Sequence, residues 1–97
     1  MQEDEPVRED DVIDDVLGDN PRASQLRLMR AALEERRLAF RAELKSAADD
    51  PNRTRLQSKL KALDRQIDAL RQEEAITEFV ETSVKVTLTK ASLEDDE

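Results

Sequence analysis

Two stretches of the sequence repeat apolar residues at the spacing of one helix face, and the two repeats fit each other. Residues 51–81 alternate steps of four and three between apolar residues, the heptad pattern of a coiled coil, and residues 21–48 show a similar 3–4 spacing. Facing residues of an antiparallel hairpin have a nearly constant sum of residue numbers. The facing pairs are Leu44 with Leu56, Phe40 with Leu60, and Leu33 with Ile67, and the numbers of each pair add to 100.

These repeats predict an all-α fold, an antiparallel two-helix coiled-coil hairpin. The predicted seam consists of Leu26, Met29, Leu33, Phe40, Leu44, Leu56, Leu60, Leu63, Ile67 and Leu70. Asn20 and Asp50 each precede a proline, and such side chains cap helix N-termini while proline fits the first helical position. We therefore expect helices over about 21–48 and 51–81. The single glycine of the chain argues against a multi-stranded sheet.

The N-terminal segment is strongly acidic. Residues 1–20 carry nine acids against Arg8, which accounts for a charge of −8, the same as the net charge of the whole chain. This composition predicts a flexible arm. Within it, the apolar residues of 12–17 fall at helical spacing and Gly18 is a suitable C-terminal stop. A helix this short is marginal alone, so it would fold either on a partner or back onto the hairpin.

The second predicted helix is longer than the first. Its residues Ile76, Phe79 and Val80 lie opposite the beginning of the first helix, where little of that helix remains to cover them. Their cover would come from the 12–17 patch, from a second copy or from a partner.

Residues 82–97 are predicted to be a partner-binding strand with an acidic tail. In Ser83–Lys90 the apolar residues alternate, so that Val84, Val86 and Leu88 would point to one side of a strand. The chain holds no second strand, so this one would pair with another sheet edge or with its own copy. The alternative is that these residues extend the second helix.

Two further surfaces suggest partners. Small residues such as Ala32, Ala39 and Ala62 follow a second face of the helices. A homodimeric four-helix bundle or a partner helix would cover this face, unless the alanines serve only helix propensity. A basic stripe would suit an anionic partner, although neutralisation by acids of the same chain, such as Asp64, Asp68 and the acidic arm, is the simpler interpretation. The stripe consists of Arg30, Arg37, Arg41 and Lys45. Arg37 lies at a seam position, where it would pair with Asp64 or extend its head to water.

Several classes of site have no candidate residues in the sequence. Without Cys or His there is no thiol nucleophile, zinc-finger ligand set or histidine base, and no glycine-rich phosphate loop occurs. We expect no catalytic, cofactor or metal site. No apolar run is long enough to span a membrane, and the lack of cysteine favours a cytoplasmic location.

The sequence thus favours a non-enzymatic regulator or adaptor that binds a protein through Ile76, Phe79 and Val80 and through the strand residues. One alternative is a self-assembling dimer. Another is a factor associated with nucleic acid or the transcription machinery. The acids Asp49 and Asp50 at the hairpin tip resemble those of hairpin factors that enter the RNA polymerase secondary channel, such as the Gre factors, although AADDPN lacks their spaced-acid motif.

Overall fold

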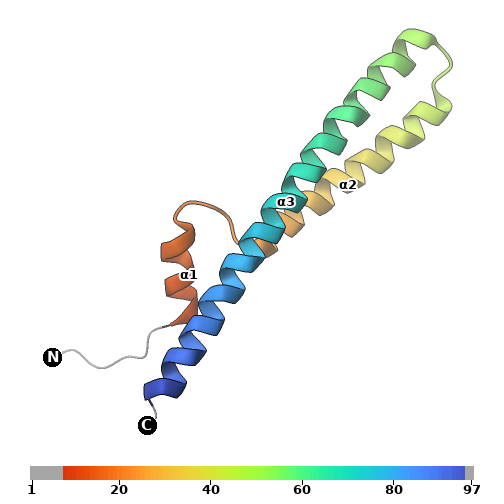
Figure 1. Cartoon of the computed structure of the whole chain (residues 1–97). Helices are drawn as coiled ribbons and strands as arrows, with labels where there is room; N and C mark the ends of the chain where they lie inside the picture. Colours follow the sequence, from red (N-terminus) through yellow and green to blue (C-terminus); the bar gives the residue numbers. More distant parts are fainter. Residues whose placement is uncertain (1–7, 96–97) are drawn as a thin grey trace.

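The computed structural model describes residues 8–95, and all regular structure in this part of the chain is helical (Figure 1). The helices are α1 (Glu9–Leu17), α2 (Ala23–Ser46) and α3 (Asp50–Asp95). α2 and α3 run antiparallel and side by side, and α1 lies along the later half of α3, beyond the start of α2 (Figure 1). The predicted all-α class is therefore confirmed. The first part of the predicted arm (1–7) and the last two residues of the tail (96–97) lie outside the described residues.

The hairpin seam is centred on large aliphatic side chains. Leu26, Leu56, Leu63 and Ile67 are at most 5% exposed. The other predicted seam residues on either side are half-buried: Leu33, Phe40, Leu44, Leu60 and Leu70. Two helices cover each other on one stripe only, so positions at the edge of the stripe keep some contact with water.

Met29 does not belong to the seam, and this part of the prediction is wrong. Its side chain is 50% exposed. The seam positions of α2, all buried or half-buried, instead follow an unbroken heptad: Ala23, Leu26, Arg30, Leu33, Arg37, Phe40 and Leu44. Arg30 occupies the position that the apolar pattern assigned to Met29, because its guanidinium group has acidic partners across the seam.

α3 carries a matching heptad that continues to its later half. Its seam positions, all buried or half-buried, are Leu56, Leu60, Leu63, Ile67, Leu70, Glu74, Thr77, Glu81, Val84 and Leu88. Three polar residues in the middle of this series hide its continuity from a search for apolar residues.

Ser83–Lys90 is part of α3, so the predicted strand is wrong and the alternative of a longer helix is right. No glycine or proline interrupts the chain after Pro51. A helix satisfies its own backbone hydrogen bonds, whereas a single strand would leave them unpaired. In the helix Val84 and Leu88 share the seam face, while Val86 is 52% exposed on another face.

The helix ends differ from the predicted caps. Asn20 donates its side-chain N–H to the carbonyl of Leu17 at 3.0 Å, so it closes the end of α1 and does not cap α2. At the hairpin tip it is Asp49, not Asp50, whose carboxylate accepts the backbone N–H of Asn52 at 3.3 Å. α2 begins and ends two residues inside its predicted bounds, and α3 begins one residue early.

α1 is a folded part of the molecule, so the expected flexibility does not apply to residues 9–17. Ile13 is fully buried and Leu17 is 9% exposed, both on the face that packs against α3. Gly18 ends the helix at φ 61°, a value that glycine adopts without strain, and donates its N–H to the carbonyl of Asp14 at 2.9 Å. Of the covers expected for Ile76, Phe79 and Val80, the structure shows the 12–17 patch, but only in part: Val80 is half-buried, whereas Ile76 and Phe79 remain 65% and 62% exposed.

The corrected seam makes a direct prediction for stability. Ile67→Ala should lower the free energy of unfolding by about 2–5 kcal/mol, because the side chain is 1% exposed and a cavity would remain. Met29→Ala should cost less than about 1 kcal/mol, since half of that side chain already faces water. Urea unfolding followed by circular dichroism measures both, and equal losses would contradict the corrected seam.

Candidate functional site

An apolar groove lies between α1 and the later half of α3. Its volume is about 310 Å³. α1 contributes Val12 and Val16, and α3 contributes Phe79, Val80, Ser83, Val84, Thr87 and Leu88. None of these lining side chains is charged, which distinguishes the groove from the rest of a chain with 41% charged residues.

The groove exists because α3 continues its seam beyond the reach of α2. Val84 and Leu88 occupy heptad positions, yet α2 begins opposite Glu81. α1 covers only part of this extension. Val16 and Phe79 remain 59% and 62% exposed, so large apolar side chains face water on both walls.

Arg22 ties α1 to the other two helices. As the residue that precedes α2, it lies 3.0 Å from the carboxylate of Glu81 on α3. On α1 it lies 3.4 Å from Asp14 and 3.6 Å from Asp10. The position of α1, and therefore the width of the groove, depends on this one guanidinium group together with the burial of Ile13 and Leu17.

Glu81 also closes the N-terminus of α2. Its carboxylate accepts the backbone N–H of Ala23 at 3.0 Å, in place of the side-chain cap expected from Asn20. Burial opposes ionisation of Glu81, but the hydrogen bonds from Ala23 and Arg22 outweigh it and hold its pKa below the ordinary value. A carboxylate is also favoured by the positive end of the helix dipole.

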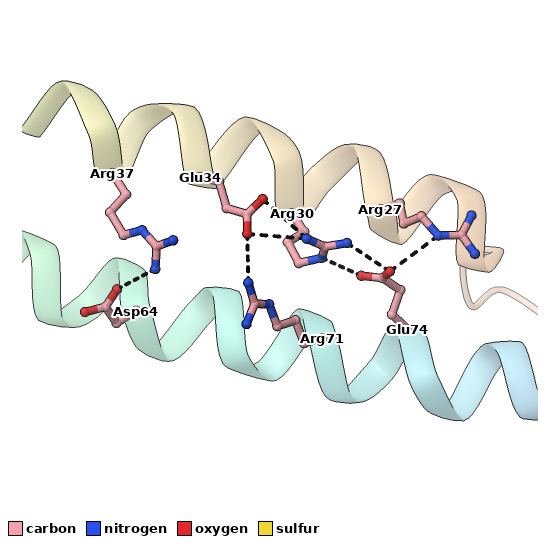
Figure 2. A network of polar contacts seen from close by, with 7 residues as sticks. All are labelled: Arg27, Arg30, Glu34, Arg37, Asp64, Arg71 and Glu74. Carbon is pink, nitrogen blue, oxygen red and sulfur yellow. Dashed lines mark hydrogen bonds and ion pairs between the residues drawn. The ribbon is translucent and has the colours of Figure 1, made fainter.

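Further along the hairpin, a network of ion pairs crosses the seam (Figure 2). Glu74 is 7% exposed and accepts two hydrogen bonds from Arg30, at 2.7 and 3.2 Å. Arg30 also contacts Glu34 at 3.3 Å, and Glu34 accepts a hydrogen bond from Arg71 at 3.1 Å. Arg27 lies 3.5 Å from Glu74, so three arginines surround the two glutamates.

These contacts favour the charged forms. The hydrogen bond from Arg30 holds the pKa of Glu74 below its ordinary value, and the bond from Arg71 does the same for Glu34. The hydrogen bond with Glu74 raises the pKa of Arg30. The network therefore stays ionised at neutral pH.

The predicted basic stripe is divided between two roles. Arg30 belongs to the network, and Arg37 pairs with Asp64 at 3.0 Å, so the pairing alternative for Arg37 is the one observed (Figure 2). Arg41 and Lys45 are exposed near the hairpin tip, and within residues 8–95 neither forms an ion pair. Two of the four cations are thus engaged inside the molecule.

The predicted partner-binding residues are spread over three adjoining hollows. Phe79, Val80, Val84 and Leu88 line the groove. Ile76, 65% exposed, lies in a neighbouring hollow beside Leu17 and Pro21. Val86 faces a third hollow, together with Ala75 and Thr82. The α1 wall was missed as part of a site, although the amphipathic pattern of residues 12–17 was visible in the sequence.

Within the described range 8–95, no group of three or more acidic side chains is placed to hold a metal ion. None of the helices described combines the length and apolar character needed to cross a membrane. Comparison of the chain with protein-family models, curated proteins and solved structures found no match.

The seam carboxylates predict a loss of stability in acid. Because the folded-state pKa of Glu34, Glu74 and Glu81 is lowered, the unfolded chain takes up protons first as the pH falls through the ordinary value of 4.5. Stability should be fully present above that pH and decline as the pH drops through the lower folded-state values. Thermal unfolding by circular dichroism across this window measures the decline.

Two substitutions at neighbouring positions distinguish the effect of Glu74 on acid stability from the effect of an exposed acid. Glu74→Gln should reduce the pH dependence, because it removes one of the shifted carboxylates, and should destabilise the protein at neutral pH by leaving Arg30 without its main partner. Glu73→Gln removes the same charge from an exposed position and serves as the control. Identical pH profiles for the two variants would show that the seam pairs do not govern acid stability.

Proposed function

We propose that this chain is a non-enzymatic regulatory or adaptor protein that binds an amphipathic helix of a partner protein in the groove between α1 and α3. The observation that carries the proposal is an open groove without charged lining side chains in an otherwise highly charged molecule. Exposed apolar surface of this kind is costly in water and typical of interaction sites. With Ser83–Lys90 helical, addition of a strand is no longer part of the proposal.

A helix suits the groove better than an extended peptide. The α3 wall runs from Phe79 to Leu88, which corresponds to about 14 Å or two to three helical turns. Within residues 8–95 there is no strand, so no sheet edge can pair with an extended chain. A helix satisfies its own backbone and brings apolar side chains to the groove at three- and four-residue spacing.

Charge defines the kind of helix. Asp11 and Asp15 are exposed on α1, adjacent in sequence to the wall residues Val12 and Val16, and neither forms an ion pair within residues 8–95. A partner helix with basic residues along its flank would complement them, which favours the correct orientation and a fast encounter. The nucleic-acid alternative is weakened because Arg30 and Arg37 are engaged in ion pairs across the seam.

A labelled amphipathic peptide of leucine and lysine should bind, with a leucine–glutamate peptide of the same apolar face as control. Val84→Asp should weaken binding of the lysine peptide at least about tenfold, because it introduces a charge that binding would bury. Fluorescence anisotropy measures this, and circular dichroism checks that the helices are retained.

The matched control is Val86→Asp, which adds the same charge on a face outside the groove. Non-specific attraction of a basic peptide to an acidic protein would increase equally in both variants. Equal binding by the two variants, or equal binding of both peptides, would contradict the groove as the site.

A further inference from the structure

A second apolar stripe runs along α3 on a face that neither α1 nor α2 covers. Its positions are Ala75, Phe79, Thr82, Val86 and Thr89, which follow steps of four and three. All five are exposed, Phe79 by 62% and Val86 by 52%. The first four line a continuous hollow of about 590 Å³ on this face. The intramolecular seam of α3 has the same heptad spacing, so this second stripe has the form of an unoccupied coiled-coil seam.

We propose that this second stripe pairs α3 with α3 of a second copy of the chain, in antiparallel orientation. Pairing Phe79 with Thr82 of the second copy also places Ala75 against Val86, and by symmetry each contact occurs twice. The two residue numbers of each facing pair add to 161. Such a two-fold contact is closed, so it produces a dimer and not a filament.

The charges beside the stripe select this partner and this orientation. Glu78 and Lys85 are both exposed and occupy equivalent heptad positions, each one residue before a stripe position. Equivalent flanking positions face each other in an antiparallel pair. Glu78 of each copy therefore comes beside Lys85 of the other, which gives two ion pairs across the dimer.

The parallel arrangement lacks this complementarity. There the position of Lys85 faces that of Lys90, so two like charges meet on each side. Glu78 would face Ser83 and gain no ion pair. The antiparallel α2–α3 seam of the hairpin also has an ion pair between flanking residues, because Glu34 and Arg71 lie beside it and pair at 3.1 Å.

Glu78 remains available for a second partner. It contacts Arg27 at 2.9 Å, but its side chain is 47% exposed, and Arg27 also contacts Glu74. The groove and the second stripe adjoin at Phe79, which lines both, but Val84 belongs only to the groove and Val86 only to the stripe. Val84 and Val86 are two residues apart, which separates their directions by about 160° around the helix. Dimerisation through Val86 therefore leaves Val84 free, and this inference does not rest on the proposed function.

The paired stripe is short. Four apolar or threonine layers over about 17 Å of helix cover less than the standard interface of about 1,200–2,000 Å², so we expect dissociation at roughly ten to a hundred micromolar. Sedimentation equilibrium of the full chain over micromolar to millimolar concentration measures the dissociation constant. About 0.1 M salt screens the net charge.

Reversing the charge of Glu78 in one variant and of Lys85 in another, and then mixing the two, tests both the partner and the orientation. Glu78→Lys alone gives four lysines along the dimer flanks, and Lys85→Glu alone gives four glutamates, so each variant should associate at least about tenfold more weakly than the original chain. An equimolar mixture of the two restores opposite charges at every contact and should form a heterodimer about as strong as the original dimer.

Val86→Asp should abolish association while leaving helix content unchanged, and Val84→Asp should leave association unchanged. A monomer at millimolar concentration would overturn the proposal, as would two charge variants that associate like the original chain. A mixture no stronger than its components would overturn the antiparallel pairing. Because Val84→Asp and Val86→Asp affect peptide binding and self-association in opposite ways, failure of one proposal is distinguishable from failure of the other.

Discussion

The packing of a 24-residue helix on a 46-residue helix determines the rest of this structure. α3 contains no glycine and no proline after Pro51, so nothing in the sequence ends it where α2 begins. Its heptad continues as far as Leu88, but α2 covers that heptad only as far as Glu81. The remaining seam must be covered by something else or left in water. α1 is the cover that the chain itself provides, and the groove is what α1 leaves open.

Polar layers set the alignment of the hairpin. An apolar heptad alone tolerates a shift of one repeat, because every layer looks similar after the shift. Glu74, 7% exposed, restricts this freedom, since the shift of one repeat that brings it opposite Ala23 would separate it from Arg30 and leave a buried charge unpaired. Glu81 acts in the same way at the start of α2, where it holds both Arg22 and the backbone of Ala23. Long side chains reach along as well as across the seam, which explains why ion pairs join residues whose numbers add to as much as 105, as in Glu34 with Arg71.

The sequence allowed the helical class, the hairpin and most of its register to be predicted, because those follow from apolar residues at regular spacing. The two main errors have a common physical cause. Met29 was placed in the seam and Ser83–Lys90 in a strand because a search for apolar periodicity treats arginine and glutamate at seam positions as interruptions. With Arg30 and Arg37 accepted at seam positions of α2, and Glu74, Thr77 and Glu81 at those of α3, both heptads become continuous. The groove required more than this, since the docking of α1 depends on contacts of Arg22 with acids far apart in sequence.

The alternating apolar residues Val84, Val86 and Leu88 can be explained within a helix. Alternating apolar residues on a helix point to opposite sides, which is unfavourable if only one side is buried. Here Val84 and Leu88 face the groove beside α1, Val86 lies outside that groove, and Phe79 lies at the boundary between the two stripes. A helix that served only its own hairpin would gain nothing from the second stripe. Two apolar stripes on one helix are expected where the helix is surrounded by neighbours on several sides, and α1 supplies only one of them. Both proposals would place the later half of α3 at the centre of a larger assembly of helices.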